Sequence, residues 1–104
     1  MKIVAVAACT VGIAHTYIAQ KAIEDECARR GIECKCETQG GMGIENEIDD
    51  DDLEQADFAL LAIAIGIEGE ERFEALQDAG KCLTIDPSEV IAHPVEIIDR
   101  LIAM

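Results

Sequence analysis

A cysteine and a histidine lie six residues apart in the stretch AACTVGIAHTYIAQ, which joins an apolar segment to an amphipathic one. The amphipathic segment predicts a helix, so Cys9 precedes a helix N-terminus. Unpaired backbone N–H groups and the positive end of the helix dipole can stabilise a thiolate or bind a phosphate there. Gly12 would let the backbone curl toward an anion, and His15 and Thr16 would add side-chain donors. The stretch indicates phosphate chemistry at Cys9, and a small buried thiol is the alternative.

Cysteine phosphatases and the related arsenate reductases also place their nucleophile in such a loop. These enzymes need an arginine six residues after the cysteine, because its planar guanidinium binds phosphate through two parallel hydrogen bonds. His15 occupies that position here. The pattern therefore disfavours this enzyme class, which we keep as an alternative.

Short apolar runs alternate with amphipathic stretches along the chain. The runs predict strands at residues 2–8, 32–38, 58–65 and 81–85. The stretches predict helices from Ala14 to about Arg30, after 49–52, over 70–79 and after Pro94. This order predicts a three-layer α/β/α, Rossmann-like domain with a four-stranded parallel sheet in the order 2-1-3-4. Cys9 then follows the first strand at the topological switch point, where such sheets bind ligands.

The second predicted strand, residues 32–38, alternates between apolar and charged side chains. Ile32, Cys34, Cys36 and Thr38 share one face, and Glu33, Lys35 and Glu37 share the other. We therefore expect this strand at an edge of the sheet, with its charged face in solvent.

Length and charge narrow the class of protein further. The 104 residues suffice for one domain, which we expect to span residues 1–104. The 22 acidic and 8 basic side chains give a net charge of −14, which repels nucleic acid and anionic lipid. No segment reaches the roughly 18 apolar residues of a membrane span. We expect a soluble cytoplasmic protein without membrane insertion, whose five cysteines are reduced.

Several motifs follow Cys9 in a consistent order: CTVGIAHTYIAQKAIE, then ETQGGMGIENEI, then Ala56–Asp57 and ERF at 71–73. Over roughly the first 75 residues they resemble the enzyme IIB component of the fructose family of the bacterial phosphotransferase system. The resemblance implies a phosphohistidine–sugar phosphotransferase that accepts a phosphoryl group from enzyme IIA onto Cys9. The phosphocysteine would then supply a fructose-like sugar bound by the membrane enzyme IIC. No cofactor is implied.

The resemblance also assigns residues to the site, with Cys9 and His15 as its catalytic pair. The phosphate loop would comprise Thr10, Val11, Gly12, Ile13, Ala14, His15 and Thr16. The candidates for the site wall or a partner contact are Gln39, Gly40, Gly43, Asn46 and Arg72. For Arg72, a structural ion pair is an equal alternative to a contact with phosphate or partner.

Three positions depart from the family pattern. Family loops usually read Cys-Pro-Thr-Gly, so Thr10 and Val11 replace a proline and a hydroxyl, and Ala64 replaces an aspartate late in the third strand. These departures motivate a second hypothesis of a different class, a regulatory or docking module that keeps the fold without transfer.

Two further patterns are suggestive of metal binding. Cys34 and Cys36 lie about 7 Å apart on one strand face, whereas zinc sites usually use Cys-x2-Cys with further ligands nearby. The aspartates at 49–52 lack the glycine and loop length of an EF-hand. We expect core packing for the thiols, a helix cap for the aspartates, and no metal site.

Overall fold

The computed structural model describes residues 1–9, 13–40 and 43–104. Within these residues the strands are β1 (Lys2–Ala8), β2 (Glu33–Gly40), β3 (Gly43–Glu45), β4 (Phe58–Ile63) and β5 (Cys82–Ile85). The helices are α1 (Ile13–Arg29), α2 (Asp50–Gln55), the 3-10 helix η1 (Glu70–Phe73), α3 (Glu74–Asp78), α4 (Pro87–Ala92) and α5 (Pro94–Ile102). Over this part of the chain, no helix has both the length and the apolar character needed to cross a membrane.

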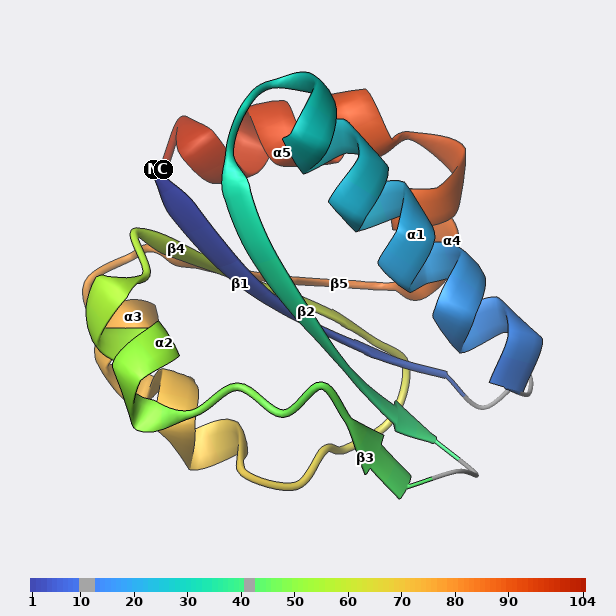
Figure 1. The fold of residues 1–104 in the computed structure, drawn as a ribbon, viewed down its shortest axis with the longest axis horizontal. Helices are drawn as coiled ribbons and strands as arrows, with labels where there is room; N and C mark the ends of the chain where they lie inside the picture. Colours follow the sequence, from blue (N-terminus) through green and yellow to red (C-terminus); the bar gives the residue numbers. More distant parts are fainter. Residues whose placement is uncertain (10–12, 41–42) are drawn as a thin grey trace.

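The strands form one mixed sheet in the order β3-β2-β1-β4-β5 (Figure 1). β1 pairs in parallel with β2 and β4, and β4 pairs in parallel with β5. The α/β class is confirmed, but the expectation of a four-stranded, all-parallel sheet was wrong. The glycine-rich connection after β2 contains a fifth strand, in which Ile44 and Glu45 pair antiparallel with Gln39 and Thr38. Such a short strand among glycines leaves no periodic pattern in the sequence.

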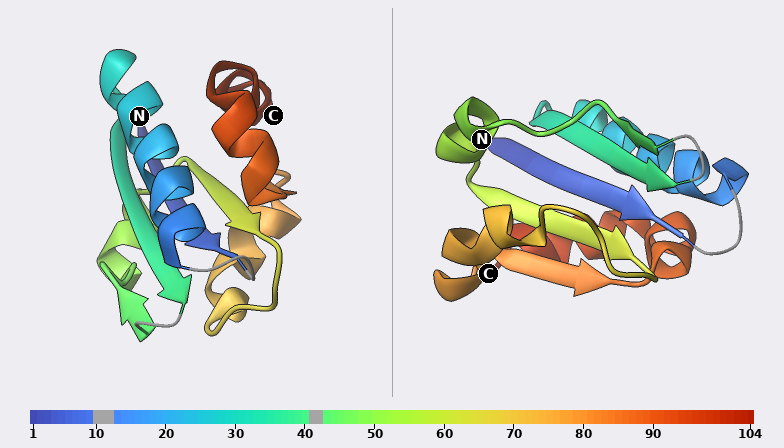
Figure 2. Two further views of the ribbon diagram at one scale, coloured as in Figure 1. Left: turned by 90° about the vertical axis from the view of Figure 1, so that its right-hand side faces the viewer. Right: turned by 90° about the horizontal axis from the view of Figure 1, so that it is seen from below.

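Helices cover both faces of the sheet and complete three layers (Figures 1 and 2). Successive residues of β1 point to opposite faces, so Ile3, Ala5 and Ala7 pack under α1, α4 and α5. Val4 and Val6 pack on the other face, which η1, α2 and α3 cover. Both faces of β1 are thus buried, as expected for a central strand.

Local signals explain where several helices begin and end. Asp49 caps α2: its side chain accepts from the Asp52 N–H, and the Asp52 side chain accepts from the Asp49 N–H. Asp86 caps α4 through one bond, which its side chain accepts from the Ser88 N–H. Gly31 follows α1 with a φ of 71°, a conformation that glycine adopts without strain. The expectation that the aspartates at 49–52 supply a helix cap is therefore confirmed.

β2 differs from the strand that alternation predicts. β3 covers its outer side, and Glu37, expected in solvent, has an exposed fraction of 0%. Glu33 remains exposed and Lys35 is half-buried. The expectation of an edge strand with a wet charged face was therefore wrong, because β3 pairs with β2 and because Glu37 has a partly buried cationic partner, Arg72.

Candidate functional site

Cys9 lies directly beyond the carboxyl end of β1, where β1 is flanked by β2 and β4. This is the topological switch point of the sheet, as the strand order requires. The residue is 8% exposed and lines an open cavity. Thr10, Val11 and Gly12 of the predicted phosphate loop lie outside the described residues, and α1 follows from Ile13.

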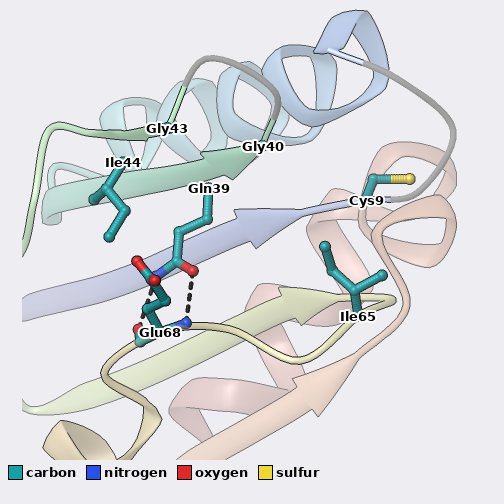
Figure 3. Close-up of a pocket in the computed structure, with 7 residues that line it drawn as sticks. All are labelled: Cys9, Gln39, Gly40, Gly43, Ile44, Ile65 and Glu68. Atoms are coloured by element: carbon teal, nitrogen blue, oxygen red, sulfur yellow. Dashed lines mark hydrogen bonds between the residues drawn. The ribbon is translucent and has the colours of Figure 1, made fainter.

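The cavity has a volume of about 520 Å³ and is built by three segments besides Cys9. They are the end of β2, the short strand β3 and the connection that follows β4. Its lining residues are Cys9, Gln39, Gly40, Gly43, Ile44, Ile65 and Glu68. Figure 3 shows Cys9 and Ile65 at one end of the cavity and Ile44 and Glu68 at the other. Three of the four predicted wall residues between 39 and 46 thus line the cavity that contains Cys9.

His15 lies in the first turn of α1 and contacts the thiol of Cys9. The distance between Sγ and the imidazole Nδ1 is 2.8 Å, short enough for a hydrogen bond in either direction. The next residue, Thr16, is 3% exposed, and its hydroxyl has no hydrogen-bond partner within the described ranges. A Cβ placed on Gly40 would lie 4.0 Å from that hydroxyl oxygen. The first turn of α1 thus brings two polar side chains beside Cys9 and the cavity wall.

Gln39 joins β2 to the segment after β4. Its side-chain amide donates to the Glu68 carbonyl at 2.9 Å, and its side-chain oxygen accepts from the Glu68 N–H at 2.8 Å. Figure 3 shows these bonds. The side chain therefore pairs with the Glu68 backbone much as a neighbouring strand would, and it fixes the segment that carries Ile65.

The Glu37 carboxylate is completely buried beneath this wall and accepts four hydrogen bonds. Oε1 accepts from Arg72 Nη1 at 2.8 Å and from the Ile48 N–H at 2.9 Å. Oε2 accepts from Arg72 Nη2 at 2.9 Å and from Gln39 Nε2 at 2.7 Å. Burial tends to raise the pKa of Glu37, but the bonds from Arg72, Gln39 and Ile48 outweigh it and lower the pKa below its usual value.

Arg72 is paired in the way that the structural alternative expected. Besides Glu37, it donates from Nε to the Gly69 carbonyl at 2.7 Å, from Nη1 to Ile48 at 2.9 Å and from Nη2 to Glu68 at 3.3 Å. The hydrogen bond with Glu37 raises the pKa of Arg72, which stays cationic. A guanidinium has five N–H groups, and the five bonds engage all of them. Arg72 also lines a second cavity of about 230 Å³, next to the first.

Two other predicted positions have structural contacts. Asn46 donates from its side chain to the Cys36 carbonyl at 3.0 Å and adopts a φ of 56°, so it secures the turn after β3. Ala64 follows β4, and its N–H donates to the Ala8 carbonyl at 3.0 Å. Ala64 therefore extends the pairing with β1 to the residue that precedes Cys9.

The cysteines that suggested a metal pair belong to the core. Cys36 is fully buried in the apolar cluster under α1, and Cys34 packs against that cluster. Burial raises the pKa of Cys36, and a hydrogen bond with Cys27 together with burial raises the pKa of Cys34. Neutral buried thiols are poor metal ligands. Core packing of this pair is confirmed.

The sequence interpretation missed four residues of this region: Glu37, Ile44, Ile65 and Glu68. Glu37 was assigned to solvent by alternation, although it lies in the same ETQGG motif as Gln39. Ile44 and Ile65 are 39% and 38% exposed at the cavity. Ile44 stands among the glycines after β2, whereas Ile65 was assigned to the predicted strand 58–65, which in the structure ends at Ile63. Glu68 contributes backbone atoms, and no sequence pattern marks such a role.

The chain matches one protein family and several proteins of known sequence. Residues 4–100 match the family described as "PTS system, Lactose/Cellobiose specific IIB subunit". A relative from Escherichia coli, "PTS system fructose-like EIIB component 2", is 41% identical over 101 residues, which cover 96% of this chain and 91% of the relative. "PTS system fructose-like EIIB component 1", also from Escherichia coli, is 34% identical over 102 residues, which cover 98% and 94%.

Solved structures show the same likeness in three dimensions. A domain of the fructose-specific IIABC component of the phosphotransferase system of Borrelia burgdorferi superposes with a TM-score of 0.88 at 38% identity, over 98% of this chain and 93% of that one. A protein described as a predicted fructose-specific IIB from Escherichia coli has a TM-score of 0.88 at 34% identity, over 96% and 85%.

Proposed function

Because this chain belongs to the IIB family of the bacterial sugar phosphotransferase system, we propose that Cys9 carries the phosphoryl group of that system. In this proposal the whole chain, residues 1–104, acts as one phosphoryl-carrier domain. The donor is a phosphohistidine on enzyme IIA, and the acceptor is a sugar bound by the membrane enzyme IIC. The names of the relatives favour a fructose-like sugar. The cytoplasmic location expected from the sequence stays a prediction.

The observation that carries the proposal is the contact between Cys9 Sγ and His15 Nδ1 at the edge of an open cavity. In the first transfer, His15 accepts the thiol proton and the thiolate attacks phosphorus. The P–S bond forms as the P–N bond to the donor imidazole breaks. That nitrogen keeps the electron pair and takes up the proton that His15 accepted, so the Cys9–His15 pair ends this step with one proton fewer. A protein performs such a transfer mainly by positioning the reactants and stabilising the charge on the phosphoryl oxygens.

The second transfer regenerates the enzyme. A sugar hydroxyl attacks phosphorus, the P–S bond breaks, and sulfur keeps the electron pair. The proton that the sugar hydroxyl loses passes to the Cys9–His15 pair and restores its original protonation. The buried hydroxyl of Thr16, next to Gly40, is a suitable donor to a phosphoryl oxygen.

Phosphorylation by a purified, phosphorylated enzyme IIA of the fructose type tests the proposal. We expect intact mass to increase by one phosphoryl group and peptide mapping to place it on Cys9. Cys9→Ser should lose this thiol phosphate, whereas Cys82→Ser, a change at a half-buried cysteine of β5, should keep it. Thiol phosphate that persists in Cys9→Ser would overturn the proposal.

His15→Ala tests the role of the imidazole. We expect the rate constant of transfer at saturating donor to fall by about 10²-fold, within the range of general acid–base catalysis, while donor affinity stays nearly unchanged. His93→Ala is the matched control, since His93 is exposed and pairs with Glu96. An unchanged rate in His15→Ala would remove His15 from the chemistry.

The departures at Thr10, Val11 and Ala64 keep the docking module as a second candidate. The same experiment separates it from a phosphoryl carrier. Stoichiometric binding of enzyme IIA without any gain in mass would favour the docking module. Turnover of a small aryl phosphate would favour the phosphatase class.

A further inference from the structure

The ion pair between Glu37 and Arg72 links β2 to the connections that follow β3 and β4, next to the Cys9 cavity. Glu37 lies in β2 and accepts from the Ile48 N–H, in the connection after β3. Arg72 donates to the carbonyls of Ile48, Glu68 and Gly69, the last two in the connection after β4. One ion pair, with its carboxylate fully buried, therefore holds both connections against β2.

The hydrogen-bonding positions of both charged groups are occupied within the protein, so neither group is available to bind a phosphoryl group. Each Glu37 oxygen accepts two hydrogen bonds, and each Arg72 N–H is donated to a carbonyl or to Glu37. Arg72 lines the neighbouring cavity, whereas the cavity at Cys9 is lined by Gln39 and Glu68. Any effect of the pair on Cys9 must therefore pass through those two neighbours.

Gln39 supplies the connection between the ion pair and the cavity. Its Nε2 donates to Glu37 as well as to the Glu68 carbonyl, so the amide is held in one orientation. In that orientation its oxygen faces the Glu68 N–H. Loss of the carboxylate at position 37 would release the amide to rotate and would leave the Glu68 backbone without a fixed partner.

We propose that Glu37 and Arg72 are positioning residues, which fix Gln39 and the Glu68 backbone as one wall of the Cys9 cavity and thereby set the rate of phosphoryl transfer. This inference rests on the proposed function of Cys9. The pair acts without touching the phosphoryl group. Wall geometry matters because small displacements from the reactive arrangement cost large factors in rate.

The test uses two variants of the pair and one matched control in the full chain. Glu37→Gln keeps the shape of the side chain and removes its charge, and Arg72→Lys keeps the charge but cannot bridge both carboxylate oxygens. The control is Glu26→Gln. Glu26 is also a buried carboxylate paired with arginines, Arg29 and Arg30, but it lies near the end of α1 remote from Cys9.

Amide hydrogen exchange measures the wall without any phosphoryl transfer. We expect faster exchange at the amides of Ile48 and Glu68 in Glu37→Gln and in Arg72→Lys, and wild-type exchange at both in Glu26→Gln. Should either variant fail to fold, Gln39→Met serves instead. It removes the amide that joins the wall to Glu37 but keeps the ion pair, so it should speed exchange at Glu68 alone. Wild-type exchange at Glu68 in the folded variants would overturn the inference.

Transfer kinetics then test the effect on Cys9. We expect the rate constant at saturating phosphorylated enzyme IIA to fall about tenfold in Glu37→Gln and in Arg72→Lys, with little change in half-saturation. Because both changes release the same wall, the double variant should be no slower than either single one. A double variant with multiplied losses, or an effect confined to Arg72→Lys, would indicate direct contact with phosphate and overturn the positioning role.

The two proposals fail in different ways. A wild-type protein that accepts no phosphoryl group overturns the function proposed for Cys9, while the exchange experiment still decides whether the pair fixes the wall. Transfer that is as fast in Glu37→Gln as in Glu26→Gln overturns the positioning role and leaves the carrier function intact.

Discussion

On the face covered by α1, α4 and α5, the sheet meets a wide apolar cluster that includes Ile23, Leu60 and Leu101. On the opposite face, a smaller apolar cluster around Phe73 shares the space with the ion pair of buried Glu37 and half-buried Arg72. The Arg72 guanidinium also lies 5.1 Å from the centre of the Phe73 ring. On the first face the buried charged group, Glu26, is paired at the far end of α1, whereas the second face places a polar network beside the cavity.

The difference indicates a division of tasks. Burial of apolar surface is non-directional and stabilises the fold as a whole. Hydrogen bonds among Glu37, Arg72 and Gln39 are directional and fix particular backbone atoms at the cavity. Changes on the apolar face should therefore lower stability with little effect on transfer, and changes on the polar face should affect transfer beyond their effect on stability.

The largest effect that we expect on stability is on the apolar face. Leu101 is fully buried on α5, so Leu101→Ala should lower the free energy of unfolding by about 2–5 kcal/mol, through lost burial and the cavity left behind. Urea unfolding measures the loss. Transfer to Cys9, measured at a temperature where the variant is folded, should keep its wild-type rate. A rate that falls together with stability would contradict the division between the faces.

How much of this could be predicted from the sequence also differs between the faces. The continuous apolar runs of β1 and β4 predicted their strands and their central place, because both faces of such a strand must be covered. The sequence placed Cys9 and His15 near one helix N-terminus, as candidates to bind an anion, but it did not predict the direct contact between their side chains. These features depend on local pattern and on the chain order of the elements.

The polar network could not be predicted in the same way. Alternation assigned Glu37 to solvent, because a pattern of charged residues does not indicate which of them has a buried partner. That partner, Arg72, lies 35 residues further along the chain. β3 was missed for a related reason: its three residues pair with β2 through backbone bonds that any sequence can form.

A second prediction compares two glycines of similar conformation. Gly69 and Gly80 have φ values of 72° and 71°, so alanine at either should cost about 1–2 kcal/mol of backbone strain. At Gly69 a Cβ would also lie 2.5 Å from Arg72 Nε, whereas at Gly80 no described atom lies within 4 Å. Gly69→Ala must therefore displace Arg72.

We expect Gly69→Ala to lower the free energy of unfolding more than Gly80→Ala does. It should also slow transfer to Cys9, because displacement of Arg72 loosens the polar network. Urea unfolding and single-turnover transfer, measured on both variants, provide the comparison. Equal transfer rates in the two variants would show that the position of Arg72 does not affect the site. The functional contrast between the two faces would then be wrong.

A third prediction concerns α2, which lies on the polar face but away from the cavity. Asp49→Ala removes the N-cap and should cost about 1 kcal/mol of unfolding free energy. Asp50→Ala, a change at an exposed neighbour, is the control. Transfer should be unaffected by either change, because α2 contributes nothing to the lining of the Cys9 cavity. Slower transfer in Asp49→Ala would mean that the whole face, rather than its polar network, supports the site.

The smallest effect that we expect is on the pH dependence of stability. Glu26, at the end of α1, has its pKa lowered from 4.5 to about 2, first by the hydrogen bond from Arg29 and then by that from Arg30. The pKa of Glu37 is also lowered in the folded state. A carboxyl whose pKa is lower in the folded state stabilises the protein above its unfolded pKa, and this contribution is lost as the pH falls through the folded value.

Wild-type stability should therefore fall as the pH drops below about 4.5, in part because the unfolded chain then binds protons that Glu26 and Glu37 do not yet bind in the folded state. Both Glu26→Gln and Glu37→Gln should flatten this slope, which urea unfolding at a series of pH values measures. Only Glu37→Gln should in addition speed amide exchange at Glu68, since only Glu37 is bonded to Gln39. Faster exchange at Glu68 in Glu26→Gln would show that any buried carboxylate supports the wall and that the two faces do not differ in this respect.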